Sequence, residues 1–292
     1  MTLPAHDTIV TYPAGELVRH ATVLHTAPAR DGLVAVVTDA TSFHPVDAAW
    51  PDQPADTGTL RAGDRELPIR DAVVAATDGS ELHVGDDVPV RKGTEGWAFV
   101  VAHLMDGGGP VAEGDQVVIT ADASARRALS LGHSACHAAS LALNRAVESR
   151  WSKPARTDAL GRPDFDGIAI TSSRIEPFGS VDRYRLNKSL RRAGFDATGL
   201  AEALDELGRE VSAAVGEWVA AGSTVRVERD GDRLTDRRSW VAELPEGVAR
   251  IACGGTHVDS LAELGAVRVA FELVDDAGTP VLEMRTRVGA DG

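Results

Sequence analysis

Apolar and polar positions alternate over short stretches of the first 120 residues, and Gly, Pro and Asp clusters interrupt the alternation. A period of two residues is typical of a strand with one buried face. The pattern predicts strands over residues 18–24, 32–38, 97–103 and 116–120. Because short strands joined by turns fold into sandwiches or closed sheets, we expect a small β-barrel-like domain over residues 1–120.

Helical periodicity first appears after residue 120. One helix is expected to begin near Asp122 or Ser124, and its apolar positions are Leu129, Cys136, Leu143 and Val147. A second helix is expected between Thr198, as N-cap, and Gly222, where it ends. Its apolar stripe, which we assign to a hydrophobic core, comprises Leu200, Leu204, Leu207, Val211, Ala214, Val215 and Trp218.

The rest of the chain has two patterns. Residues 151–182 are rich in Pro, Gly and charge and predict little regular structure. Strands are expected over residues 224–227, 248–251, 267–273 and 280–285, the last two forming a hairpin that turns near residues 276–278. The predicted class is α+β, in which helices cover an antiparallel sheet over residues 121–292, after the β-barrel-like domain.

Composition is that of a folded cytoplasmic protein. Hydrophobic residues make up 43% of the 292 residues, which is enough to fill two cores. No stretch approaches the roughly 18 apolar residues that a membrane span needs, so we expect no membrane partner. Two cysteines give no disulfide framework. The oligomeric state has no signal in the sequence.

Charge is distributed unevenly. Residues 1–120 hold 7 Lys and Arg against 18 Asp and Glu, and account for −11 of the formal net charge of −14. Residues 145–192 instead hold 11 basic against 6 acidic residues, a local excess of +5. An anionic polymer would dock there, although a solvated surface with ordinary ion pairs explains the excess equally well. The candidates for contact with such a polymer are Arg183, Arg185, Arg191 and Arg192.

Two short motifs supply a metal-ligand set. His133 and His137 stand four residues apart in the first predicted helix, so both rings leave one face. Cys253 and His257 flank Gly254-Gly255-Thr256, and the glycines let the backbone bend so that both side chains converge. Three imidazoles and a thiolate suit Zn²⁺. The plain alternative is helix-packed imidazoles and an inert thiol.

The number of ligands leaves the role of the metal open. Four protein ligands usually make a structural site, whereas a hydrolytic zinc keeps one position for water or substrate. The residues therefore allow either four ligands or three ligands and a neighbour. The wide separation of the two motifs, and a domain large enough to fold without metal, favour catalysis.

These motifs resemble those of the alanyl-tRNA synthetase editing domain and its free-standing AlaX-type trans-editing relatives. The family combines a helical His-x-x-x-His with a later Cys-Gly-Gly-Thr-His-Val, matched here by His133, His137 and residues 253–258. Residues 41–45 (TSFHP) and 53–58 (QPADTG) resemble its Thr-x-Phe-Tyr-Pro and Gln-Pro-x-Asp-x-Gly segments, and residues 261–265 continue the metal loop. Since no aminoacylation domain is recognised, the resemblance is to the stand-alone form.

The resemblance implies a zinc-dependent hydrolase that removes a wrongly attached Ser or Gly from tRNA(Ala), with mischarged tRNA as partner. Zinc held by His133, His137 and Cys253, with His257 as fourth ligand or neighbour, would activate water and polarise the ester carbonyl. The carried-over catalytic-site residues are Thr41, which would sense the amino acid, Gln53 and Asp56. Each has a plainer interpretation: Thr41 as a strand-end residue, and Asp56 as part of a turn.

One departure concerns the loop before Gln53. The family has a run of glycines there, and this chain has Val46-Asp47-Ala48-Ala49-Trp50-Pro51-Asp52, which is bulkier, acidic and stiffened by proline. Three functions therefore compete. They are a trans-editing aminoacyl-tRNA deacylase, a relative that hydrolyses or binds a small ester or amide without tRNA, and a non-catalytic module with a structural zinc ion.

Overall fold

A computed structural model gives the fold of the chain and describes residues 3–48, 50–107 and 111–289. Ala49, named above in the loop before Gln53, lies outside the described residues. The structure divides into two compact units. The first comprises Met1–Arg126, Arg229–Arg238 and Gly254–Thr256, and the second comprises Arg127–Glu228, Ser239–Cys253 and His257–Gly292.

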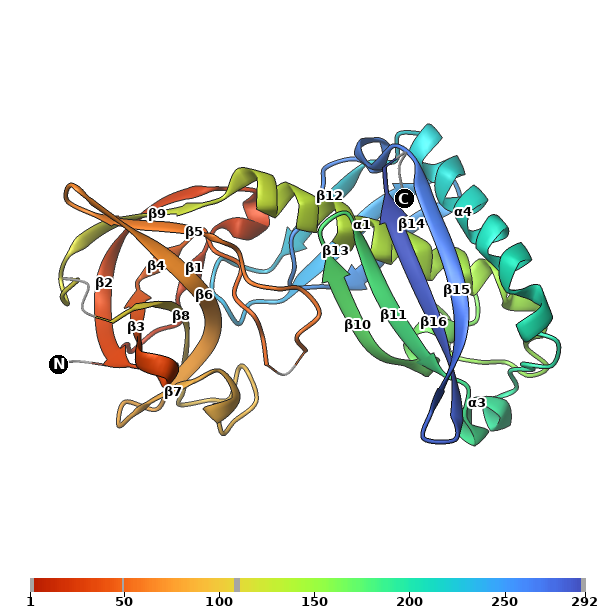
Figure 1. Cartoon of the computed structure of the whole chain (residues 1–292), viewed down its shortest axis with the longest axis horizontal. Helices are drawn as coiled ribbons and strands as arrows, with labels where there is room; N and C mark the ends of the chain where they lie inside the picture. The colour runs from red at the N-terminus through yellow and green to blue at the C-terminus, as the bar shows by residue number, and fades with distance from the viewer. Residues whose placement is uncertain (1–2, 49, 108–110, 290–292) are drawn as a thin grey trace. The chain divides into compact units, whose positions relative to one another are not determined.

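Strands dominate the first unit (Figure 1). They are β1 (Ile9–Val10), β2 (Val18–Pro28), β3 (Leu33–Thr38), β4 (Ala40–Thr41), β5 (Gly58–Ala62), β6 (Arg65–Thr77), β7 (Leu82–Val84), β8 (Ala98–Asp106) and β9 (Gln116–Ala121). Seven pair in the order β5-β9-β2-β3-β8-β6-β7, and β5 also pairs with β6. Six strands therefore form a closed ring, with β7 attached to β6.

The ring surrounds one core. Inward positions on its strands supply fully buried apolar side chains, among them Leu60, Phe99, Val101 and Ile119. Phe43, which follows β4, is also fully buried in this core. All four strands predicted from alternation in this part of the chain are present within a few residues of the predicted bounds.

Helices and two sheets make up the second unit. The helices are α1 (Ala123–Ala146), whose first turn belongs to the first unit, α2 (Phe165–Ala169), α3 (Lys188–Ala193) and α4 (Leu204–Ala220). The strands are β10 (Ile170–Glu176), β11 (Gly179–Arg185), β12 (Val225–Arg229), β13 (Arg238–Leu244), β14 (Gly247–Ala252), β15 (Val267–Asp276) and β16 (Thr279–Val288). They pair as β10-β11-β16-β15 and β12-β13-β14, so the predicted α+β class is confirmed.

The first predicted helix and the hairpin occur where the apolar periodicity placed them, but the prediction of Thr198 as N-cap of the second helix is wrong. The 3₁₀ helix η5 (Ala201–Ala203) comes first, and α4 begins at Leu204 with Ala203 as its N-cap. In α4, Leu207, Val211, Val215 and Trp218 are buried in the core of the second unit. β15 and β16 pair from Val267↔Val288 to Asp276↔Thr279, with the turn at residues 276–279. The periodicity of buried positions therefore gave the buried face of α4 and the hairpin correctly, but not the first residue of the helix.

The prediction of little regular structure over residues 151–182 is wrong in its second half. Residues 165–169 form α2, and β10 and β11 make a hairpin that turns at Phe178, which has a φ of 60°. β10 is polar, and only Ile175 among its residues is buried. Its strand conformation depends on pairing with β11, which pairs in turn with β16, rather than on its own pattern.

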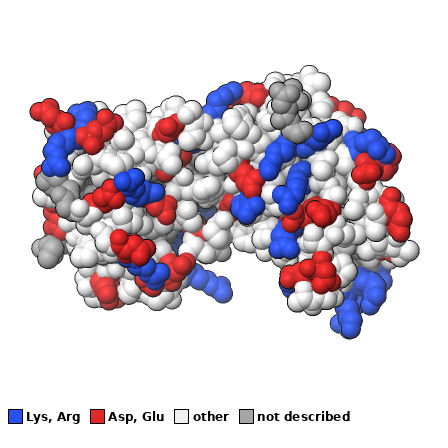
Figure 2. Space-filling model, viewed as in Figure 1, with Lys and Arg blue, Asp and Glu red and all other residues white. Residues whose placement is uncertain are grey.

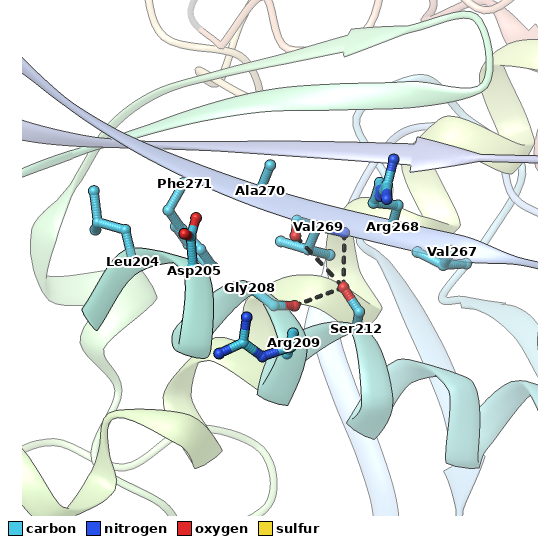
Figure 3. Close-up of a pocket in the computed structure, with 10 residues that line it drawn as sticks. All are labelled: Leu204, Asp205, Gly208, Arg209, Ser212, Val267, Arg268, Val269, Ala270 and Phe271. Atoms are coloured by element: carbon cyan, nitrogen blue, oxygen red, sulfur yellow. Dashed lines mark hydrogen bonds between the residues drawn. The ribbon is translucent and has the colours of Figure 1, made fainter. Parts of the chain in front are cut away.

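The outer strand of the four-stranded sheet has a side-chain cap. β15 is an edge strand, and α4 lies along it (Figure 3). Ser212 Oγ of α4 accepts a hydrogen bond from Val269 N at 2.9 Å and donates to Gly208 O at 2.6 Å. A groove of about 470 Å³ between the two elements is lined by residues such as Leu204 and Phe271.

Candidate metal centre

Four side chains from two distant segments meet in the second unit. They are His133 and His137 of α1, and Cys253 and His257, which follow β14. One potential ligand atom from each lies within 4.8 Å of the other three. The prediction that these segments converge on one point is confirmed by this geometry.

The separations suit a tetrahedral ion. Cys253 Sγ lies 3.4 Å from His133 Nε2 and 3.3 Å from His257 Nε2. Zinc bonds of about 2.0 Å to nitrogen and 2.3 Å to sulfur place tetrahedral ligand atoms about 3.3–3.8 Å apart. The three imidazole rings lie close together, tilted by 32–53° to one another, with centroid separations of 4.5–5.2 Å. The two sulfur–nitrogen separations therefore match a tetrahedral zinc site, and all four candidate ligand atoms lie within 4.8 Å of one another.

His137 has the features of a ligand that could bind a metal ion. Its Nε2 atom is buried and, in the part of the chain that the structure describes, has no hydrogen-bond partner. Leaving a buried polar atom unpaired costs about 1–3 kcal/mol. Burial, with a further contribution from His133, lowers the pKa of His137 well below 6.5, so the ring is neutral and keeps a lone pair. A metal ion would satisfy that lone pair.

Neighbouring side chains orient the candidate ligands. Ser134 Oγ lies 3.3 Å from His257 Nδ1 and accepts a hydrogen bond from Val258 N at 3.1 Å. If His257 ligates through Nε2, its Nδ1–H donates to Ser134, the usual arrangement for a metal-bound imidazole. Trp240, fully buried, packs on His137 with ring centroids 5.1 Å apart. One wall of the site is therefore apolar.

Local structure fixes where α1 presents its histidines. Asp122 caps the helix, because its Oδ1 accepts hydrogen bonds from Ser124 N and Ala125 N at 2.8 and 2.9 Å. Gly132 lets the helix approach the β10–β11 turn closely. A Cβ atom at that position would lie 2.4 Å from Glu176 O and 2.5 Å from Gly179 O. The next residue in the chain is His133.

The second motif lies between two ordered elements. Cys253 follows the last residue of β14, and the 3₁₀ helix η6 (Leu261–Leu264) comes after His257. A capping box fixes η6, in which Ser260 accepts from Ala262 N and Glu263 accepts from Ser260 N. Regular structure therefore lies on both sides of the motif, with β14 directly before Cys253 and η6 after His257.

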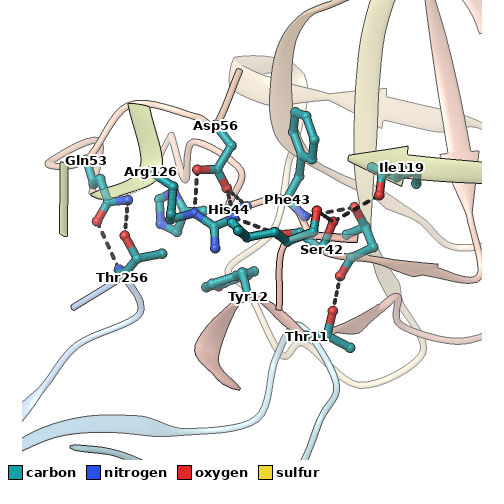
Figure 4. Close-up of polar contacts among 12 residues, drawn as sticks. Thr11, Tyr12, Ser42, Phe43, His44, Gln53, Asp56, Ile119, Arg126 and Thr256 are labelled. Carbon is teal, nitrogen blue, oxygen red and sulfur yellow. Dashed lines mark hydrogen bonds and ion pairs between the residues drawn. The ribbon is translucent and has the colours of Figure 1, made fainter. Parts of the chain in front are cut away.

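Gln53 makes a paired contact in the first unit, which includes Gly254–Thr256 (Figure 4). Its Nε2 donates to Thr256 Oγ1 and its Oε1 accepts from Thr256 N, each at 3.0 Å. Tyr12 donates to Gly254 O at 3.1 Å. Gln53, Tyr12 and Thr256 are all buried. The side chain of Gln53 thus holds the residue that precedes His257 in the sequence.

Asp56 is part of a buried ion pair. Arg126 Nε donates to its Oδ1 at 2.6 Å, Arg126 Nη2 contacts its Oδ2, and His44 N donates to Oδ2 at 2.5 Å. Arg126 also donates to Ser42 O at 2.7 Å. Only 7% of the Arg126 side chain and 1% of the Asp56 side chain are exposed. This carboxylate joins the segment after β4 to the start of α1.

Thr41 lies in the interior of the first unit and is fully buried. Its hydroxyl is 2.9 Å from His103 Nε2 and accepts a hydrogen bond from Phe43 N at 3.0 Å. His103 Nδ1 lies 3.0 Å from Val36 O, which can only accept, so Nδ1 carries the proton and Thr41 donates to Nε2. Burial lowers the pKa of His103 to about 4, which keeps the ring neutral.

Comparison with known proteins identifies relatives of the chain. No family model matches it. An alanine–tRNA ligase of Frankia casuarinae is 30% identical over 258 residues, which cover 88% of this chain and 24% of the ligase. The ligase of Prochlorococcus marinus is 28% identical over 210 residues, covering 72% and 21%. A chloroplastic/mitochondrial ligase of Micromonas pusilla is 28% identical over 251 residues, covering 86% and 24%.

The chain is homologous to part of the alanyl-tRNA ligases. The resemblance inferred from the motifs is thereby confirmed. The chain spans about a quarter of the length of these relatives.

The four arginines predicted to contact RNA lie on two elements of this chain, β11 and α3. Arg183 and Arg185 are on β11, where they lie 3.6 Å from Glu283 and 3.3 Å from Asp276. Arg191 and Arg192 are exposed on α3. Among the described residues, no helix is long and apolar enough to cross a membrane.

Several residues of this chain that contact the candidate ligands, Asp56 or Thr41 were not predicted from the sequence. Arg126, Tyr12 and His103 pair with side chains or carbonyls that are distant in the sequence, and nothing local marks them. Ser134 follows a histidine of the first motif directly, and its hydroxyl on the ligand-bearing helix was a signal available in the sequence. Trp240 stands in a strand that the apolar pattern did not reveal.

Proposed function

We propose that the chain is a zinc-dependent hydrolase that removes a wrongly attached amino acid, Ser or Gly, from tRNA(Ala). The observation that supports the proposal most strongly is the convergence of His133, His137, Cys253 and His257, with the unpaired Nε2 of His137. Homology to part of the alanyl-tRNA ligases supports tRNA(Ala) as the acceptor. The cytoplasm stays the predicted location.

The protein's own groups would hold the ion and keep it in one geometry. His133, His137 and Cys253 would bind it, with His257 as fourth ligand or neighbour. Zinc there would supply Lewis-acid chemistry, lowering the pKa of a water molecule and polarising the ester carbonyl. Ser134 would fix the orientation of the His257 ring, and Trp240 would keep water from one side of His137.

Thr41, Gln53 and Asp56 enter the proposal as residues of the catalytic site with different duties. Gln53 would act through Thr256, and Asp56 through Arg126, as positioning residues, because those contacts use their polar atoms. Thr41 would recognise the hydroxyl of a seryl group. Its own hydroxyl donates to His103 and accepts from Phe43 N, which leaves one lone pair to which a seryl hydroxyl could donate.

The four arginines of the basic segment are proposed as contacts for the tRNA body. Arg183, Arg185, Arg191 and Arg192 are at least partly exposed, as an interaction with phosphate requires.

A structural zinc site is the second candidate function. The four candidate ligand atoms lie within 4.8 Å of one another, so all four could bind one ion, which would be the arrangement of a closed site. In that case removal of the metal unfolds the second unit. A catalytic ion would instead leave the folded metal-free protein without activity.

The test is an assay of amino-acid release from tRNA(Ala) charged with Ser, Gly or Ala, using zinc-loaded protein. Cys253→Ala is expected to abolish release of Ser or Gly and to keep the fold. Cys136→Ala is the matched control, because this buried thiol contacts Asp182 and is outside the ligand cluster. Equal activity of Cys253→Ala and wild type, or no release from any charged tRNA, would reject the proposal. Hydrolysis of a small aminoacyl ester alone would favour an enzyme that needs no tRNA.

A further inference from the structure

One face of α3 is uniformly basic. Lys188, Arg191 and Arg192 follow the spacing i, i+3, i+4, which places their side chains on the same side of a helix. All three residues are exposed, whereas Leu190 is buried in the core of the second unit. In the view of Figure 2, Lys and Arg side chains gather where Figure 1 shows α3. The cations therefore project into solvent as one group.

Within the described ranges, none of these three side chains has an ion-pair or hydrogen-bond partner. Three basic residues on β10 and β11 differ, since Arg174 lies 2.8 Å from Glu176, Arg183 3.6 Å from Glu283 and Arg185 3.3 Å from Asp276. An acidic chain with 44 Asp and Glu against 30 Lys and Arg has ample acids to pair. The face of α3 nonetheless lacks them.

The mutual repulsion of these side chains is unfavourable, because like charges at i, i+3 and i, i+4 repel. Lys188 in the first turn also meets the positive end of the helix dipole, whereas Arg191 and Arg192 lie in the last turn, where the dipole favours cations. No ion pair within the described chain offsets the repulsion among the three cations. A bound anion with several charges would remove the repulsion.

A groove borders this face. It has a volume of about 610 Å³ and is lined by α3, by Asp196–Thr198 and by the beginning of β16 at Thr279 and Pro280. The nearby acidic groups are engaged: Asp196 accepts from Thr198 N at 2.9 Å, and Asp276 pairs with Arg185. The ammonium of Lys153 donates to Arg192 O at 3.3 Å and adds a fourth positive charge at the end of α3.

We propose that Lys188, Arg191 and Arg192 form a docking face for the phosphodiester backbone of RNA. The inference rests on the proposed function, because it is the tRNA body of the substrate that the face would hold. It adds Lys188 to the proposed contacts and identifies α3 as the element whose cations are unpaired, whereas Arg183 and Arg185 of β11 each lie beside an acidic side chain. Backbone phosphates are read without regard to base sequence, so this face adds affinity and not selectivity among tRNAs.

The experiment measures binding of the full chain to uncharged tRNA(Ala) as salt is varied. The test variant is Lys188→Gln/Arg191→Gln/Arg192→Gln. The matched control removes three exposed charges that are paired with acids and have no proposed role in binding, as Arg30→Gln/Arg70→Gln/Arg226→Gln. We expect the test variant to bind at least about tenfold more weakly at 0.1 M salt, and the slope of log K against log salt to fall by about two to three. The control is expected to stay within about threefold of wild type.

Unchanged binding in the test variant, or an equal loss in both variants, overturns the inference, since equal loss would reflect net charge alone. Binding of an unrelated tRNA is expected to fall in parallel. The binding experiment and the hydrolysis assay test different proposals. If tRNA binds through α3 but no amino acid is released, the docking face is supported and the hydrolase is rejected. If the test variant binds tRNA and releases the amino acid as the wild type does, the docking face is rejected and the hydrolase is supported.

Discussion

Removal of the Asp56 carboxylate tests the buried ion pair of the first unit. In Asp56→Ala, Arg126 would keep only its hydrogen bond to Ser42 O, and His44 N would lose its acceptor. The guanidinium would then be an unpaired charge with 7% of its side chain exposed. Breaking such a buried pair from one side costs about 3–5 kcal/mol. We therefore expect the free energy of unfolding to fall by that amount.

The assay is urea and thermal unfolding of the wild type and two controls. At about 2–4 °C per kcal/mol for a protein of this size, the melting temperature of Asp56→Ala should fall by roughly 6–20 °C. Asp106→Ala breaks the pair with Arg70, in which the side chains are 60% and 55% exposed, and should cost less than about 1 kcal/mol. Asp56→Ala/Arg126→Met should recover much of the loss, because no charge is left buried. An Asp56→Ala protein as stable as Asp106→Ala would refute the reasoning.

Three further predictions concern the metal, a glycine contact and a buried histidine. Zinc at a hundred times its dissociation constant should stabilise the folded protein by about 2.7 kcal/mol over the chelator-treated form, and a melting temperature indifferent to zinc would contradict the site. Gly132→Ala should lower the free energy of unfolding measured in urea, because the new Cβ would lie 2.4 and 2.5 Å from backbone oxygens. Gly216→Ala in α4, with open space around it, should raise that free energy by up to about 1 kcal/mol. A change of the same sign in both variants would count against the close contact at Gly132. The folded-state pKa of His103, about 4, lies below its unfolded value of 6.5, so the unfolded chain binds more protons between these values and stability should fall by about 3 kcal/mol from pH 7 to pH 4. His103→Gln should flatten that part of the urea-unfolding pH profile, and an identical profile in the variant would show that another group is responsible.

Elements with a regular buried period could be predicted from the sequence. The apolar stripe of α4 and the β15–β16 hairpin are examples, because the spacing of apolar residues within each element identifies the face that it buries. β10 could not be predicted in this way. Its sequence, ITSSRIE, buries one apolar side chain, and its conformation comes from pairing with β11.

The same difference between local and distant information applies to the residues of the candidate site. The spacing within each metal motif is local, so His133, His137, Cys253 and His257 could be found and combined. The hydroxyl of Thr41 and the carboxylate of Asp56 have partners at His103 and Arg126, which lie 62 and 70 residues away. A linear pattern contains no information on such partners.

The serine that caps β15 has a consequence for assembly. An edge strand offers free amides and carbonyls to which another chain can add a strand. Ser212 occupies the outward amide of Val269, near the start of the strand, from the side of α4. A strand added from another chain would have to displace both the Ser212 hydroxyl and α4, which carries it. One side chain therefore helps to keep the four-stranded sheet from growing into a fibril-like stack.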